Sequence, residues 1–395
     1  MILGQIAWVD CLAFLIFLAP QLIIQVGVVD TAICGLKALP FLLVQMPFQL
    51  IRERYFTSYA NKSPFVQTNT LFQDLVIRCV RYAFAYIPSS IGKVFFSKNV
   101  ALPFLRFRML RHGILRRPLH WKEIDRQGLR GVYMIHDSAR RPDVVVYYCH
   151  GGGFSMGSAY FYMEFLLGWL TLLHDDGGYS NPAVFALDYT LVPEATYPTQ
   201  VQETLAGYKY LLSIVDDPAQ IIVSGDSAGA TLVLSLLLTL SKFSNFKDRL
   251  PGLAVIISPW ASVISSRNQN TASDYLNAES LHLYGSQYLG KNASPEDSVA
   301  SPGTCRDVSW WKKSAPLHGF YFIYGREEVF APETKSVISL LRQAKVLVSE
   351  REEKHWIHAW PVVKLFLCDT KDERIGGLKA IVKICRERLG NFKDV

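Results

Sequence analysis

The hydrophobic positions of this chain follow two different patterns. Residues 6–29 are almost wholly apolar, interrupted only by one acid, one proline and two glutamines. From about Val144 onward, short apolar runs of strand character alternate with longer stretches of helical character. The first pattern is long enough for a helix that crosses a bilayer. The second predicts an α/β fold, with a mostly parallel central sheet and helices on both faces.

The most informative motif lies where one apolar run ends abruptly. Residues 221–230 read IIVSGDSAGA, so a buried strand leads into a Gly-Asp-Ser-Ala-Gly turn before an apolar helical run. A serine at such a junction sits in strained backbone that projects its hydroxyl, and the flanking glycines permit close packing. We therefore predict that Ser227 is a nucleophile, with the N–H groups of the following helix facing any anion beside it.

A second strand candidate, residues 144–148, runs into the sequence HGGGF at residues 150–154. Consecutive glycines let the backbone turn its own N–H groups into a cavity, where they stabilise the negative charge of a tetrahedral intermediate. We expect the amides of Gly152, Gly153 and Ala228 to form an oxyanion hole. A flexible loop at a strand end is the alternative. His150 precedes the serine, so the usual order of serine, acid and histidine argues against it as the base.

The C-terminal part of the chain supplies an acid and a base in that order. One strand candidate is followed by the adjacent Glu327 and Glu328, and the next by His355 and His358. A carboxylate that orients an imidazole, which takes the serine proton, completes the arrangement. On this pattern either glutamate and either histidine could serve. Two histidines three residues apart offer too few ligands for zinc, so neither a metal nor an organic cofactor is expected.

Together these motifs resemble the hormone-sensitive-lipase-like branch of the α/β-hydrolase fold, which includes arylacetamide deacetylases and fungal steryl acetyl hydrolases. The resemblance covers roughly residues 144–360. It is carried by HGGGF at 150–154, DYTLVPEATYP at 188–198, GDSAGA at 225–230, GREEVFAPE at 325–333 and IHAW at 357–360. It implies that Glu328 is the acid and His358 the base. The chain departs from the family in having Glu where Asp is commoner, and Ala359 where Gly is commoner.

We expect three parts: a hydrophobic membrane anchor at residues 1–60, a basic and aromatic membrane-proximal or cap segment at 61–120, and the catalytic domain at 121–395. Between residues 61 and 117, ten Lys or Arg residues stand against one acid, a net of +9 in a chain of net charge +7. Interleaved aromatic residues suit a surface that lies against anionic headgroups. Nucleic acid is the competing partner for such a patch, but the neighbouring anchor favours lipid. A solvated basic linker is the third possibility.

The anchor predicts a membrane protein, either single-pass or monotopic. A cleaved signal peptide fits less well, because the segment lacks a basic start and residues 32–50 remain apolar. A helix buried within the enzyme is a further alternative. Basic residues after the anchor favour a cytoplasmic catalytic domain. The resemblance instead implies the endoplasmic reticulum, where some relatives face the lumen and where sequons at Asn61 and Asn292 would be usable.

Bulky apolar residues near the motifs favour a hydrophobic substrate, and we expect Phe154, Tyr160 and Trp260 to contact it. The polar, turn-rich residues 268–301 are expected to form an insertion or part of a lid. Seven cysteines without paired spacing imply no disulfide framework. The sequence favours no particular oligomeric state.

The sequence therefore predicts a serine carboxylic-ester hydrolase, an esterase or deacetylase that acts on a hydrophobic ester. His358 would take the proton of Ser227 during attack, Glu328 would orient the imidazolium, and the three amides would hold the oxyanion. The same groups can stabilise an enolate, so a non-hydrolytic condensation or cyclisation in natural-product biosynthesis is the alternative. A binding protein with a degenerate site is a third class, which the intact set of motifs argues against.

Overall fold

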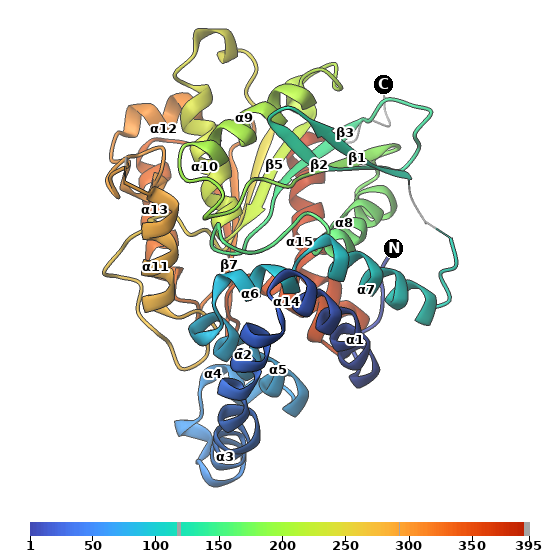
Figure 1. The fold of residues 1–395 in the computed structure, drawn as a ribbon. Coiled ribbons are helices and arrows are strands. Elements are labelled where there is room, and N and C mark those ends of the chain that lie inside the picture. Colours follow the sequence, from blue (N-terminus) through green and yellow to red (C-terminus); the bar gives the residue numbers. More distant parts are fainter. Residues whose placement is uncertain (117–119, 292, 391–395) are drawn as a thin grey trace.

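The computed structural model describes residues 1–116, 120–291 and 293–390 (Figure 1). Two residues of the sequence analysis, Arg117 of the basic segment and Asn292 of the second sequon, lie outside these ranges. Asn61 of the first sequon is exposed at the end of a short 3-10 turn.

One mixed sheet of eight strands forms the centre of the protein. The strands are β1 (His120–Arg126), β2 (Leu129–Ile135), β3 (Val144–Cys149), β4 (Pro182–Leu187), β5 (Ile221–Asp226), β6 (Leu253–Ile257), β7 (Phe320–Gly325) and β8 (Val348–Glu353). Their order across the sheet is β1-β2-β4-β3-β5-β6-β7-β8. Strand β2 pairs antiparallel with β1 and β4, whereas β4, β3, β5, β6, β7 and β8 run parallel. The carboxyl ends of the parallel strands therefore share one edge, where ligands bind in open α/β sheets.

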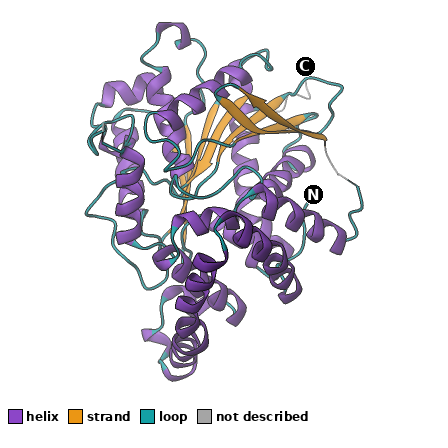
Figure 2. Ribbon diagram, viewed as in Figure 1, coloured by secondary structure: helices purple, strands orange, loops and turns teal. Residues whose placement is uncertain are grey.

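Helices cover both faces of the sheet (Figure 2). They are α8 (Met163–Asp175), α9 (Thr199–Leu211), α10 (Ala228–Leu240), α11 (Ala278–Leu289), α12 (Val308–Ser314), α13 (Ala331–Gln343), α14 (Trp360–Leu367) and α15 (Lys371–Leu389). Short 3-10 turns occur at η3 (Tyr59–Asn61), η4 (Pro218–Gln220), η5 (Ser244–Phe246) and η6 (Pro302–Thr304). Strands β3 to β7 are buried along their whole length, as expected for a parallel sheet covered on both faces. The predicted fold is confirmed.

The N-terminal part is a layer of helices that packs against the sheet domain. Its elements are α1 (Trp8–Gln25), α2 (Val28–Pro40), α3 (Met46–Ile51), α4 (Pro64–Thr68), α5 (Leu71–Tyr86), α6 (Ser89–Phe95) and α7 (Lys98–Arg111), with π-helical turns η1 (Phe41–Gln45) and η2 (Arg52–Phe56). Helices α2 and α3 project from one end of the molecule (Figure 1). By length and composition, Trp8–Gln25 and Val28–Phe56 could each cross a membrane, although such helices are weak evidence for a span.

Helix α1 is attached to the enzyme rather than standing free. Asp10 in its first turn is fully buried and accepts hydrogen bonds from Arg108 and Arg111 of α7. Arg108, itself 0% exposed, also pairs with Glu164 of α8 at 2.8 Å. Further along α1, Leu18 packs in a buried cluster with residues of α6 and α7. The first helix of the predicted anchor is therefore packed against the rest of the protein.

Half of the basic residues in the basic segment pair with acids in the described part of the chain, namely Arg78, Lys93, Lys98, Arg108 and Arg111. Seven of its ten basic residues donate hydrogen bonds to acids or carbonyls: Lys62, Arg78, Arg81, Lys93, Lys98, Arg108 and Arg111. The acids lie outside the segment's own sequence in most cases, for example Glu194 for Lys93 and Glu123 for Lys98. These ion pairs therefore join the basic segment to other parts of the chain.

Candidate active site

The predicted nucleophile lies at the sharp turn between β5 and α10. Ser227 has φ 54° and ψ −121°, a strained conformation for a residue with a side chain. A side chain at Gly225 or Gly229 would collide with the carbonyl of Cys149 at the end of β3, which explains both glycines. Ser227 is 6% exposed and therefore buried.

The glycine loop follows β3, the neighbour of β5 in the sheet. Gly152 has φ 116° and Gly153 φ 62°, conformations that L side chains rarely adopt. Within the described residues, neither glycine N–H donates a hydrogen bond to another protein group. The Ala228 amide is the first of α10, where backbone N–H groups have no partner inside the helix. These three donors are therefore available to a ligand.

A buried carboxylate next to the nucleophile holds the glycine loop in place. Asp226 accepts hydrogen bonds from the Gly151 amide at 2.8 Å and from the hydroxyls of Tyr148 and Tyr162, both at 2.7 Å. Burial raises the pKa of the Asp226 carboxyl to about 6, against the opposing effect of these donors. Asp226 lies within the predicted motif, yet the sequence analysis assigned it no role.

The structure separates the two candidate acids that follow β7. Glu328 is buried, and its Oε2 accepts hydrogen bonds from Ser258 Oγ at 2.6 Å and from the Gly325 amide at 3.1 Å. Burial raises the pKa of the Glu328 carboxyl well above its ordinary value, and the nearby Asp274 raises it further. Glu327 is only partly buried, and its side chain makes no hydrogen bond in the described part of the chain.

The two candidate histidines after β8 are also separated. His358 is buried, and its Nδ1 lies 3.9 Å from Glu328 Oε2, whereas His355 is exposed. Burial lowers the pKa of His358 to about 3, so its imidazole is neutral at physiological pH. Among the described residues, His358 Nδ1 and Glu328 Oε1 are both buried without a hydrogen-bond partner.

A four-residue segment that begins with Ile257, the last residue of β6, connects the nucleophile turn to the acid and histidine loops. The Ser227 amide donates to Ile257 O at 3.1 Å, and the Trp260 amide donates to Ser227 O at 3.2 Å. Ser258 of the same segment bonds Glu328 and accepts from the Ala359 amide at 2.9 Å. Residues 257–260 therefore contact all three parts of the predicted catalytic set.

Aromatic rings surround this region. Phe154 stacks on Tyr288 of α11 at 3.7 Å between centroids and lies 5.6 Å from Trp260. Phe330 stacks on Trp260 at 5.9 Å and meets the His358 ring edge-on at 5.1 Å. Two of the predicted substrate contacts, Phe154 and Trp260, thus belong to one buried group beside the site.

Tyr160, the third predicted substrate contact, lies elsewhere. Its ring packs against a hydrophobic cluster that includes Phe165 and Trp169 of α8, and the ammonium group of Lys98 lies 5.1 Å from the ring centroid. Phe154 and Trp260 belong to a different hydrophobic cluster. Tyr160, only six positions from Phe154, therefore packs on a different hydrophobic cluster.

The segment at residues 268–301, predicted as an insertion or part of a lid, contacts the glycine loop and the acid and histidine loops. Tyr284 of its helix α11 lies against Gly153 of the glycine loop. Asp274, in the loop before α11, accepts hydrogen bonds from the amides of Val329 and His358 at 2.8 and 3.1 Å. No role was predicted for Asp274 from the sequence, because an acid in a polar, turn-rich stretch carries no distinguishing pattern.

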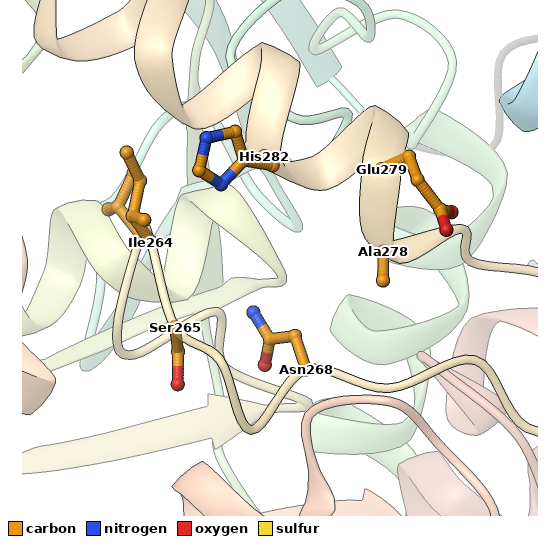
Figure 3. Close-up of a pocket in the computed structure, with 7 residues that line it drawn as sticks. Ile264, Ser265, Asn268, Ala278, Glu279 and His282 are labelled. Carbon is orange, nitrogen blue, oxygen red and sulfur yellow. The ribbon is translucent and has the colours of Figure 1, made fainter.

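A pocket of about 360 Å³ opens between the loop after β6 and the start of α11 (Figure 3). Its lining residues are Val263, Ile264, Ser265, Asn268, Ala278, Glu279 and His282. None of the predicted catalytic residues lines it. Within the described residues, no group of three or more His, Cys, Asp or Glu side chains could hold a metal ion.

Comparisons with known proteins agree with this fold. A family model described as alpha/beta hydrolase fold matches residues 146–362, more than half of the chain. A Schizosaccharomyces pombe protein with the provisional name steryl acetyl hydrolase is 34% identical over 165 residues, covering 39% of this chain and 43% of that protein. An acetyl-hydrolase of Streptomyces hygroscopicus is 28% identical over 226 residues, covering 56% of this chain and 70% of that protein. The chain thus spans about half the length of most curated relatives that it matches.

Solved structures share the fold. The crystal structure of an esterase from the bacterial hormone-sensitive lipase family superposes with a TM-score of 0.66 at 23% identity. The match covers 82% of this chain and 100% of that one.

Proposed function

The chain belongs to the α/β-hydrolase fold family, and from this premise we propose that it is a serine hydrolase that cleaves carboxylic esters through an acyl-enzyme. Its relatives named above are acetyl hydrolases and an esterase, which supports ester hydrolysis over the condensation or cyclisation alternative. The observation that carries the proposal is the segment at residues 257–260, which joins the strained Ser227 turn to the loops of Glu328 and His358.

In the proposed reaction, His358 accepts the proton of Ser227 as the hydroxyl attacks the ester carbonyl. The buried imidazole is neutral, so it is able to accept a proton. Burial also lowers its pKa and so weakens it as a base, and a negatively charged Glu328 close to Nδ1 would oppose that effect. Glu328 then stabilises the imidazolium that forms, which requires its carboxylate to close the 3.9 Å gap to Nδ1. The imidazolium gives its proton to the leaving alcohol, and water releases the acid by the reverse sequence.

The oxyanion would be held by the amides of Gly152, Gly153 and Ala228. Their freedom from other hydrogen bonds supports this role, since a donor already engaged within the protein could not stabilise a new negative charge. Asp226 contributes indirectly, because its bond to Gly151 fixes the loop before substrate arrives.

A hydrophobic ester is the substrate class that the surroundings favour. Phe154, Trp260 and Phe330 form an apolar wall beside the site. On the side of the N-terminal helices, Phe84 of α5 lies 5.4 Å from Tyr275, whose ring lies 5.7 Å from that of His358. Helix α5 of the N-terminal part is thus only two aromatic rings from the proposed base.

We also infer that the N-terminal helices attach the protein to a membrane in the monotopic manner. Large apolar side chains are exposed along α1, α2, η1 and α3, including Ile16 of α1 at 61%, Ile24 of α1 at 74% and Leu43 of η1 at 70%. A crossing by α1 would require the fully buried Asp10 to leave Arg108, at a high electrostatic cost. Attachment in the plane of one leaflet buries the exposed face and keeps this pair. That the membrane is the endoplasmic reticulum stays a prediction.

Covalent labelling tests the catalytic proposal. The full-length protein in detergent should hydrolyse nitrophenyl acetate and react with a fluorophosphonate probe, and Ser227→Ala should abolish both. Ser286→Ala, at an exposed serine of α11, is the matched control and should retain both. Labelling that persists in Ser227→Ala would refute the assignment.

Protease protection tests the membrane proposal. Tags at the two chain ends should be accessible from the same side of sealed vesicles if attachment is monotopic, and from opposite sides if α1 crosses the bilayer. Replacing Ile16 and Ile24 by Glu should reduce flotation with phosphatidylcholine vesicles, whereas the same change at the exposed Leu347 of the sheet domain should not.

A further inference from the structure

We propose that Asp274 is a positioning residue, which holds the acid and histidine loops of the active site in register through their backbone amides. Its carboxylate bonds the amide of His358 at 3.1 Å and the amide of Val329, the residue after Glu328, at 2.8 Å. The inference rests on the roles proposed above for Glu328 and His358. Asp274 contacts no reacting atom, so it would act only through these two loops.

The need for such a tie follows from where the sheet ends. Strands β7 and β8 are paired up to Gly325 and Glu353. Two further backbone bonds follow, from the Arg326 amide to Glu353 O at 2.9 Å and from the Glu327 amide to Trp356 O at 3.0 Å. Among the described residues, no backbone hydrogen bond directly joins the two segments at residues 328 and 358. Asp274 links the two segments where direct backbone hydrogen bonds between them end, because its one carboxylate accepts from an amide of each segment.

Burial makes this tie rigid. Asp274 is 1% exposed, and its Oδ1 also accepts from its neighbour's amide, Tyr275, at 2.9 Å. A buried carboxylate with three amide donors has no competing water, so the bonds define one geometry. Burial raises the pKa of Asp274 to about 6, and the amides and the charge of Arg81 oppose this rise, so the carboxylate is ionised at neutral pH.

The loop that carries Asp274 is itself held by the N-terminal helices. Arg81 of α5 donates to the carbonyls of Ala272, Ser273 and Asp274 at 3.0, 2.8 and 2.8 Å. The Phe65 amide of α4 donates to Ser273 Oγ at 3.2 Å. A continuous set of hydrogen bonds therefore runs from α4 and α5, through residues 272–274, to the backbone of the proposed base.

Steady-state kinetics of Asp274→Asn test the proposal. The asparagine keeps the size of the side chain but turns a donor toward one of the two amides, so the loops should separate slightly. We expect kcat for nitrophenyl acetate to fall by about 10- to 100-fold, because small displacements of catalytic groups have effects of this size. KM should change by less than about threefold, since Asp274 touches no substrate. Asp274→Ala, which removes every acceptor, should lose more activity than Asp274→Asn.

Asp143→Asn is the matched control. Asp143 also uses a carboxylate to accept two loop amides, those of Ser180 at 2.5 Å and Asn181 at 3.1 Å, but lies before β3, away from the site. The Asp143→Asn variant should have a lower melting temperature than wild type and an unchanged kcat. If Asp274→Asn behaves in the same way, Asp274 is merely structural and the proposal fails.

Two further measurements keep the outcome decisive. If Asp274→Asn does not fold, Arg81→Gln replaces it, with an expected loss of about 3- to 10-fold in kcat at constant KM; an unchanged kcat in Arg81→Gln would then overturn the proposal. Loss of activity in Ser227→Ala, together with full activity in Asp274→Asn, would refute only this inference. Full activity in Ser227→Ala would refute the proposed function itself.

Discussion

Ser258 Oγ donates a hydrogen bond of 2.6 Å to Oε2 of Glu328. The same hydroxyl accepts from the amide of Ala359, the residue after His358, at 2.9 Å. Ser258 has φ 44° and is fully buried, so its position is set by the turn after β6 rather than by solvent. The Ser258 hydroxyl is thus hydrogen-bonded both to the proposed acid and to the backbone next to the proposed base.

Removing this hydroxyl should impair catalysis. We expect Ser258→Ala to lower kcat roughly 10- to 100-fold, because a hydrogen bond to a charged group contributes about 1.5–3 kcal/mol and the Ala359 amide also loses its acceptor. Ser262→Ala is a close control, since Ser262 donates in the same way to Glu333, an acid outside the proposed set, at 3.2 Å. Hydrolysis rates of the two purified variants decide the matter; equal rates would contradict the prediction.

The adjacent glutamates should differ sharply in their effect. Glu328→Gln is expected to lower kcat by about 10³- to 10⁴-fold, the size of effect seen when the acid of a catalytic triad is replaced by its amide. Glu327→Gln should stay within about twofold of wild type, because that side chain is partly exposed and makes no hydrogen bond in the described residues. Comparable losses in both variants would show that the acid is wrongly assigned.

The two histidines allow a similar comparison. Asparagine tolerates the left-handed conformation of His355, whose φ is 62°, so His355→Asn should fold normally and keep its activity. His358→Asn should lose at least about 10³-fold in kcat, because no other described base is bonded to the same loops. Activity that disappears with His355 instead would reverse the choice.

The buried pairing of α1 with the enzyme should appear in stability. Arg108→Ala leaves Asp10 and Glu164 buried without their common partner, and we expect the free energy of unfolding to fall by about 3–5 kcal/mol. Arg106→Ala, at an exposed position of the same helix, should change it by less than about 0.5 kcal/mol. Denaturant unfolding in detergent measures both. A small effect of Arg108→Ala would mean that α1 is not docked as described.

Asp226 should give stability a distinct dependence on pH. Its folded pKa of about 6 lies above the ordinary 3.8, so between these values the folded protein holds a proton that the unfolded chain releases. The corresponding stabilisation is complete below about pH 4 and is lost as the pH rises through 6, on the order of 3 kcal/mol in total. Asp226→Asn should remove this component.

Melting temperatures from pH 4 to 7 test this sign. As the pH rises, the melting temperature of wild type should fall relative to that of Asp226→Asn. Asp137→Asn serves as the comparison, because hydrogen bonds to the Ala139 amide and Arg140 lower the pKa of the Asp137 carboxyl, so its contribution has the opposite sign. A pH-independent difference for Asp226 would contradict the prediction.

Local sequence determined the parts of this protein that depend on neighbouring residues. The apolar runs of β3, β5 and β7, and the glycines around Ser227, follow from backbone sterics and from burial on both faces of a sheet. The order of serine, acid and histidine along the chain limited the candidates for the acid to two glutamates and those for the base to two histidines. These features were predictable because each is encoded within a few positions of chain.

Tertiary structure alone decided which member of each pair is buried, where Tyr160 lies, and which acids neutralise the basic segment. Glu327 and Glu328 are equivalent as a pattern, and only the approach of Ser258, 70 residues earlier in the chain, distinguishes them. Asp274 likewise lies 84 residues from His358 and had no local signal. Contacts of this kind depend on the order in which strands pair across the sheet, because that order sets which loops meet at its edge, and no local pattern of polarity records it.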